Sequence, residues 1–106
     1  MDIKDFYRSA KRTINPSLTW EELKIHALLG IGGETGEIQD IYKKSYQGHE
    51  VIKERVMEEL GDLCWHIMEL CYAQHIDPEE MLEYNVDKLN KRYHSGFDTQ
   101  RSIHRE

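Results

Sequence analysis

Four carboxylates stand in two short acidic pairs near the middle of this chain. Glu34 and Glu37 form E-T-G-E, and Glu59 and Asp62 form E-L-G-D, each with i, i+3 spacing. Residues three apart on a helix lie on one face, about one turn from each other. The two pairs are also symmetric about Gly48, so a helical hairpin that folds back there would bring all four acids to one level.

Such a group of acids indicates a divalent cation, because like charges gathered in one place repel unless a cation lies among them. On a helical wheel Glu34 falls inside the apolar arc of its helix, and the other three acids border or lie just beyond theirs. A buried carboxylate without a partner is costly. Oxygen-only ligation favours Mg²⁺, or Mn²⁺, over zinc. We therefore predict a site for one of these ions formed by Glu34, Glu37, Glu59 and Asp62.

Two other kinds of site, a di-iron centre and a phosphate-binding loop, fit the sequence less well. A helical di-iron centre is the main rival, but that class uses E-x-x-H motifs, and this chain has none. The stretch G-I-G-G-E-T-G fits neither phosphate-loop pattern. Its glycines are expected to allow close helix approach or to leave room beside the acids. Acids outside the two pairs, such as Glu58 and Glu69, are expected on solvated helix faces.

Composition limits the class of protein. A chain of 106 residues is enough for one domain with one core. A hydrophobic fraction of 39% with 32% charged residues suits a helical protein with a small core, for which self-association is expected. The net charge of −6 argues against generic nucleic-acid or anionic-membrane binding. No signal-peptide or transmembrane pattern is present, so we expect a cytoplasmic location.

The elements that must position the acids are all helices. Apolar residues recur at helical spacing, and no β-alternation is present. Thr19 with Glu22 forms a capping-box pattern, and Asp77-Pro78 opens a later helix. We predict an all-α, four- to five-helix bundle with two long antiparallel helices. The expected helices are 3–14, 20–46, 51–75 and 78–93, followed by a polar C-terminal tail at 94–106.

The fourth expected helix offers positive charge. Asn85, Lys88 and Arg92 follow i, i+3, i+7 spacing and share one face, which suits a phosphate tail. The alternative is a solvated helix end, where basic residues interact favourably with the helix dipole. His66 lies one turn after Asp62 and is a candidate for the base pocket or for a contact behind the metal ligands, although such residues more often serve in packing.

Three segments together resemble the MazG-type all-α nucleoside triphosphate pyrophosphohydrolases. They are L-L-G-I-G-G-E-T-G-E-I, E-E-L-G-D-L-C-W and N-V-D-K-L-N-K-R-Y-H-S-G-F, within residues 25–97. The resemblance implies one MazG-like domain over 1–106. It also implies Mg²⁺-dependent cleavage of NTPs or dNTPs between the α and β phosphates, which yields a monophosphate and pyrophosphate in nucleotide-pool housekeeping. The implied metal ligands are Glu34, Glu37, Glu59 and Asp62, and the implied triphosphate contacts are Asn85, Lys88 and Arg92.

The resemblance further implies a homodimer or homotetramer in which a neighbouring subunit can add residues to the site. A second hypothesis keeps the same fold without catalysis, as a nucleotide-sensing or protein-interaction module. The presence of all four acids favours the enzyme, because a sensing relative could lose one of them.

Overall fold

The computed structural model describes residues 1–104, so the last two residues of the expected tail lie outside it. Within that range the chain is all-α without a β-strand, and the predicted fold class and order of helices are confirmed. The two long helices match their predicted bounds closely. The helices are α1 (Ile3–Lys11), α2 (Trp20–Ser45), α3 (Lys53–Gln74), α4 (Pro78–Arg92) and α5 (Thr99–Ile103).

The bounds differ from expectation at both ends of the chain. The first helix was expected to reach residue 14 but ends at Lys11, and the Thr13 hydroxyl donates to the Ala10 carbonyl at 3.0 Å just beyond it. Threonine hydroxyls compete with helical hydrogen bonds in this way. In the tail, the Asp98 carboxylate accepts from two backbone N–H groups and caps α5, a helix that was not predicted.

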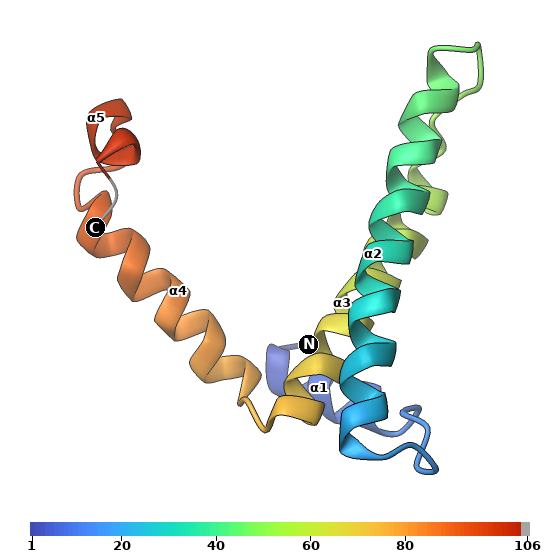
Figure 1. Cartoon of the computed structure of the whole chain (residues 1–106). Coiled ribbons are helices and arrows are strands. Elements are labelled where there is room, and N and C mark those ends of the chain that lie inside the picture. The colour runs from blue at the N-terminus through green and yellow to red at the C-terminus, as the bar shows by residue number, and fades with distance from the viewer. Residues whose placement is uncertain (105–106) are drawn as a thin grey trace.

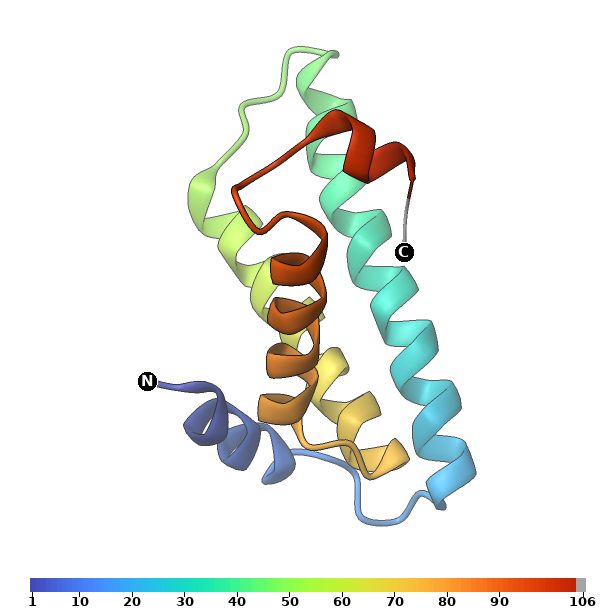
Figure 2. The same cartoon turned by 90° about the vertical axis from the view of Figure 1, so that its left-hand side faces the viewer.

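Capping and turn residues define the α2–α3 hairpin. The Thr19 hydroxyl accepts from the Glu22 N–H, and the Glu22 carboxylate accepts from the Thr19 N–H, as the capping-box pattern predicts. The hairpin turn contains Gly48 at a φ of +92°, a backbone conformation that glycine adopts without strain. The two helices then run antiparallel along their length (Figures 1 and 2).

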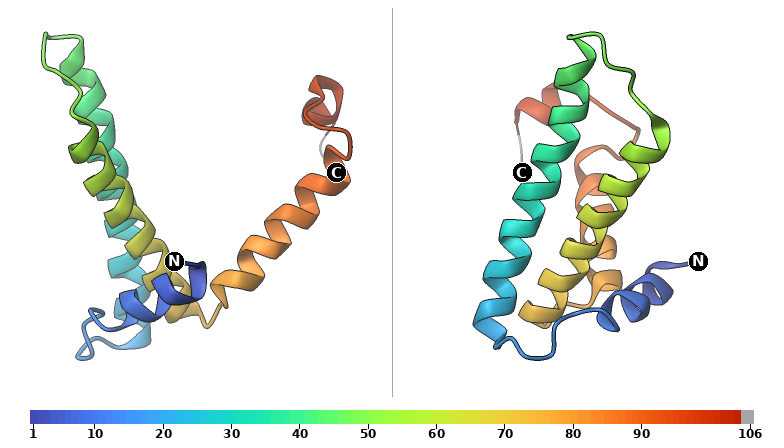
Figure 3. Two further views of the ribbon diagram at one scale, coloured as in Figure 1. Left: turned by 180° about the vertical axis from the view of Figure 1, so that it is seen from behind. Right: turned by 90° about the vertical axis from the view of Figure 1, so that its right-hand side faces the viewer.

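The core lies at the end of the hairpin far from this turn, where α1 packs against α3 (Figure 3). Its buried centre is Ile14, Leu23 and Ala73, with Leu18, Trp65 and Tyr72 packed around it. The indole Nε1 of Trp65 donates to the Thr13 hydroxyl at 2.8 Å and ties the first segment to α3. This anchor holds α1 across the base of the hairpin.

Helix α4 diverges from the hairpin, so the chain has two arms (Figure 1). It contacts α1 near its start, where Lys4 Nζ lies 3.1 Å from Glu79 Oε2. The radius of gyration is 17.0 Å, whereas a compact domain of this length has about 13 Å. The helices of the predicted bundle are therefore present, but they do not close into one compact unit within a single chain.

Both arms expose large apolar side chains. On α2, Leu29 is 71% exposed and Leu28 is 53% exposed, and on α4 Val86 is 53% exposed. Even so, no helix in the part of the chain that the structure describes is long and apolar enough to cross a membrane.

The inner side of the arms' junction forms an apolar groove of about 460 Å³, lined by residues of α1, α3 and α4.

Candidate metal centre

The hairpin brings the acids of the two pairs together. Glu34 and Glu37 lie on α2, and Glu59 and Asp62 lie on α3; we call these four residues the acid cluster. Carboxylate oxygens of Glu34, Glu59 and Asp62 all lie within 4.8 Å of one another. The symmetry about Gly48 thus corresponds to a real juxtaposition across the two helices.

The acid cluster has carboxylates without compensating partners. Oε2 of Glu34 and Oε2 of Glu59 are buried, and neither accepts a hydrogen bond from the described chain. A side-chain hydrogen bond with Glu59 raises the pKa of Glu37, and the negative charges of Glu59 and Asp62 with partial desolvation raise it further. The pKa of Glu59 is also raised: its hydrogen bond with Glu37 lowers it, but the Glu34 carboxyl, desolvation and nearby charge outweigh that effect.

These observations fit a hard divalent cation. Mg²⁺ and Mn²⁺ prefer oxygen ligands, and magnesium commonly binds through a few carboxylates together with substrate phosphates. The unpaired carboxylate oxygens of Glu34 and Glu59 could coordinate such an ion, and Asp62 is close enough to supply a third ligand oxygen. Glu37 lies beside this trio and lines the neighbouring cavity.

That cavity has a volume of about 730 Å³ and extends from the acid cluster toward the hairpin turn. We call it the turn cavity. Lys44, His49 and Arg55 are among its lining residues, together with Glu37 and Glu59. Lys44 Nζ lies 2.8 Å from Asp40 Oδ2, and this hydrogen bond holds the pKa of Asp40 below its ordinary value. The turn cavity therefore places cationic side chains beside the acids.

From the sequence we predicted phosphate contacts on the fourth helix and assigned no role to Arg55. Its position one turn before Glu59 was the available signal, since residues four apart on a helix are neighbours. Asn85, Lys88 and Arg92 lie instead on α4, the other arm, so a single chain does not bring them to the acid cluster (Figure 1). Arg92 Nε is buried without a hydrogen-bond partner among the described residues. The role of these three residues stays a prediction.

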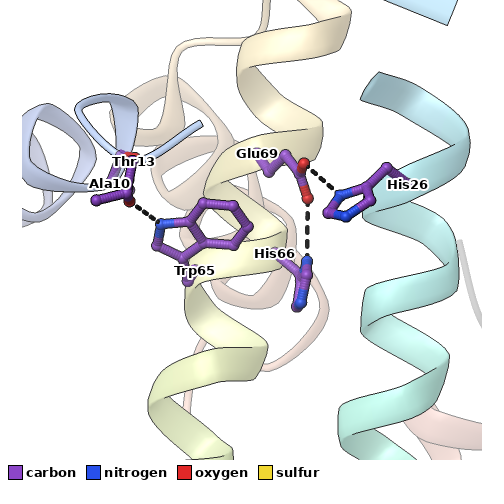
Figure 4. A network of polar contacts seen from close by, with 6 residues as sticks. All are labelled: Ala10, Thr13, His26, Trp65, His66 and Glu69. Atoms are coloured by element: carbon purple, nitrogen blue, oxygen red, sulfur yellow. Dashed lines mark hydrogen bonds and ion pairs between the residues drawn. The ribbon is translucent and has the colours of Figure 1, made fainter. Parts of the chain in front are cut away.

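Glu69 was expected on a solvated helix face, and that expectation is wrong because the residue is 1% exposed. Its carboxylate lies between two imidazoles, with Oε2 at 2.7 Å from His26 Nδ1 and Oε1 at 3.0 Å from His66 Nδ1 (Figure 4). We call these three residues the histidine cluster. The spacing H-x-x-E at 66–69 was the local signal, but His26 comes from the other helix.

The glycines near the acids have different surroundings. A Cβ at Gly30 would collide with the His66 ring, so this glycine does allow close approach of the helices. Cβ atoms at the other positions, Gly32, Gly33, Gly36 and Gly61, would meet nothing within 4 Å. Close packing therefore explains Gly30, and open space surrounds the rest.

One comparison with known proteins found a match. The model of the MazG nucleotide pyrophosphohydrolase domain matches residues 24–97, which include most of α2 and all of α3 and α4. Searches of curated proteins and of solved structures found no match. Since the matched segment is well over half of the chain and contains both acidic pairs, the chain belongs to the MazG nucleotide pyrophosphohydrolase domain family.

Proposed function

We propose that this protein hydrolyses nucleoside or deoxynucleoside triphosphates to the monophosphate and pyrophosphate in a Mg²⁺-dependent reaction, as nucleotide-pool housekeeping. Membership of the family supports nucleotide pyrophosphohydrolase activity. The observation that carries the metal requirement is the acid cluster, with buried carboxylate oxygens that have no partner in the described chain.

Glu34, Glu59 and Asp62 would hold Mg²⁺, or Mn²⁺ in its place. When bound there, the ion supplies charge neutralisation for the phosphates and lowers the pKa of a nearby water. The three residues supply a rigid arrangement of oxygens, because they project from two helices that are packed against each other. Asp62 is the most exposed of the three and faces the solvent from which a substrate would enter.

Glu37 is suited to accept the proton of the attacking water. It lies outside the trio of close carboxylates that would hold the ion and lines the turn cavity, so it would stay uncoordinated and able to accept a proton. The water oxygen forms a bond to the α phosphorus, and the bond between that phosphorus and the α–β bridging oxygen breaks. Pyrophosphate leaves, and the proton of the water passes to the Glu37 carboxylate.

Lys44 and Arg55 in the turn cavity are the cations of the same chain best placed to contact phosphate oxygens. Arginine and lysine both bind phosphates, the former through paired hydrogen bonds. Asn85, Lys88 and Arg92 would join the site from a second copy of the chain, because α4 diverges from its own hairpin (Figure 1). The exposed apolar residues on both arms and the radius of gyration of 17.0 Å support a homodimer or homotetramer.

A substrate panel tests the proposal. The purified chain is incubated with each NTP and dNTP in the presence of Mg²⁺ or Mn²⁺, and pyrophosphate and monophosphate are measured. We expect equal amounts of the two products from at least one substrate, and no turnover with a chelator. If the folded protein binds nucleotide without releasing pyrophosphate from any substrate, the nucleotide-sensing module is the better description. If it binds neither metal nor nucleotide, only the protein-interaction version survives.

A further inference from the structure

The histidine cluster is a second group of metal-ligating side chains on the hairpin, separate from the acid cluster. His26 projects from α2, and His66 and Glu69 project from α3 toward it (Figure 4). Nitrogen and oxygen atoms of the three residues all lie within 4.8 Å of one another. The cluster therefore joins the two long helices at a position between the core and the acids.

The charge of Glu69 is not balanced by a lysine or arginine in the described chain. The salt-bridge partners of this buried carboxylate are the two imidazoles alone. A buried carboxylate needs a proton, a basic partner or a metal ion to offset its desolvation.

The distances within the cluster are close to those of a metal site. Ligands at about 2.0–2.1 Å from a tetrahedral zinc ion lie about 3.3 Å from each other. The two nitrogen–oxygen distances here are 2.7 Å and 3.0 Å, a few tenths of an ångström shorter than that spacing. Two histidines with one glutamate, plus a water, form a known zinc ligand set.

The surroundings provide both rigidity and access. The His66 ring lies against Gly30, where no Cβ fits, and its centroid is 5.0 Å from that of Trp65. Only 15% of the His66 side chain is exposed, whereas the His26 side chain is 53% exposed. His66 and Glu69 thus form a fixed half-site, and His26 forms the side through which an ion and a water ligand can enter.

We propose that His26, His66 and Glu69 bind a nitrogen-preferring divalent ion of the Zn²⁺ or Co²⁺ class, at a site distinct from the Mg²⁺ site of the acid cluster. Binding replaces the two imidazole–carboxylate hydrogen bonds. Each histidine coordinates the ion through an unprotonated ring nitrogen, and its one ring proton lies on the other nitrogen. The ion cross-links α2 and α3.

The test is a Co²⁺ titration of the metal-free full chain with excess Mg²⁺ present to occupy the acid cluster. We expect one Co²⁺ per chain, with the visible absorption band of a nitrogen-ligated low-coordinate site, and displacement of that band by Zn²⁺. His26→Ala and Glu69→Gln should each weaken Co²⁺ binding by at least about 10-fold, since even residues behind metal ligands change affinity 10–100-fold. Circular dichroism checks that each variant is folded. If Glu69→Gln does not fold, the Co²⁺ affinity of His26→Ala, a substitution at an exposed position, decides the outcome.

Two matched controls make the outcome specific. His94→Ala removes an exposed histidine from another helix end and should leave the titration unchanged. Asp62→Asn disables the acid cluster and should also leave it unchanged, so a failure of the proposed hydrolase does not affect this result. Absence of the Co²⁺ band in the unmodified protein, or a band that survives both His26→Ala and Glu69→Gln, would show that the cluster is a hydrogen-bonded network only.

Discussion

The acid cluster and the histidine cluster use the same hairpin but differ in how their carboxylates are compensated. Glu69 is more deeply buried than any of the four acids, and each of its oxygens has an imidazole within hydrogen-bond distance. Glu34 and Glu59 each have a buried oxygen without any such partner. The unpaired oxygens among acidic neighbours, and not the depth of burial, are thus what the proposed Mg²⁺ site rests on.

The largest expected effect is on catalysis at the acid cluster. Asp62→Asn removes a ligand charge from an exposed position, so turnover should fall at least about 100-fold, at or beyond the upper end of the 10–100-fold loss seen for residues behind metal ligands. The melting temperature should hardly change. Pyrophosphate release is the measurement, and Glu58→Gln on the exposed side of α3 is the control. Full activity in Asp62→Asn would break the assignment of the acid cluster.

For the histidine cluster, where the Glu69 carboxylate has a structural role, we expect a loss of stability in place of the loss of turnover. Glu69→Ala leaves two imidazoles without their acceptor and opens a cavity, so the metal-free protein should lose about 3 kcal/mol of unfolding free energy. Urea denaturation measures this loss. Glu58→Ala, on the same helix but exposed, should change stability by no more than about 0.5 kcal/mol. Equal effects of the two substitutions would contradict the burial contrast.

A glycine pair sharpens the comparison by probing how tightly each layer of the hairpin is packed. Gly30→Ala forces a methyl group into the His66 ring and should cost about 1–3 kcal/mol. Gly32→Ala meets no neighbouring atom and should instead gain up to about 1 kcal/mol from helix propensity. Denaturant midpoints measured side by side give the sign of each change. A stabilised Gly30→Ala would mean that the helices are further apart at this point than described.

The smallest expected effect is a pH dependence of the metal-free acid cluster. Because the folded-state pKa of Glu37 is raised above its ordinary value of 4.5, its contribution to stability is present below that value and is lost as the pH rises through the folded pKa. Glu37→Gln should therefore raise the melting temperature at neutral pH, with a smaller gain in more acidic solution. Thermal melts with a chelator test this, and saturating Mg²⁺ should reduce the gain.

Local sequence patterns predicted much of the fold for identifiable reasons. The long helices follow from apolar spacing, and their ends follow from Thr19, Gly48 and Asp77, whose capping and turn roles involve residues close in sequence. The short α5 was missed although Asp98 caps it in the same manner. Its few residues carry too little apolar periodicity to stand out from a polar tail.

The missed features depend on contacts between distant residues. The acid cluster was found because its two pairs are each visible in the sequence and symmetric about the turn. Glu69 was misjudged because its partner His26 lies 43 residues away, and helix periodicity does not indicate which polar residue will face another helix. The divergence of α4 was also invisible, since its sequence shows an amphipathic helix but not the surface that covers its apolar side.

The contact between Gly30 and the His66 ring links two positions that are far apart in the sequence. Each residue limits the substitutions that the other position can tolerate. A side chain at position 30 requires a smaller residue at position 66, and a large ring at position 66 requires glycine at position 30. Across diverging descendants of this chain the two positions should consequently change as a pair. Neutral single replacements should be accepted at Gly32, which faces open space, but not at Gly30.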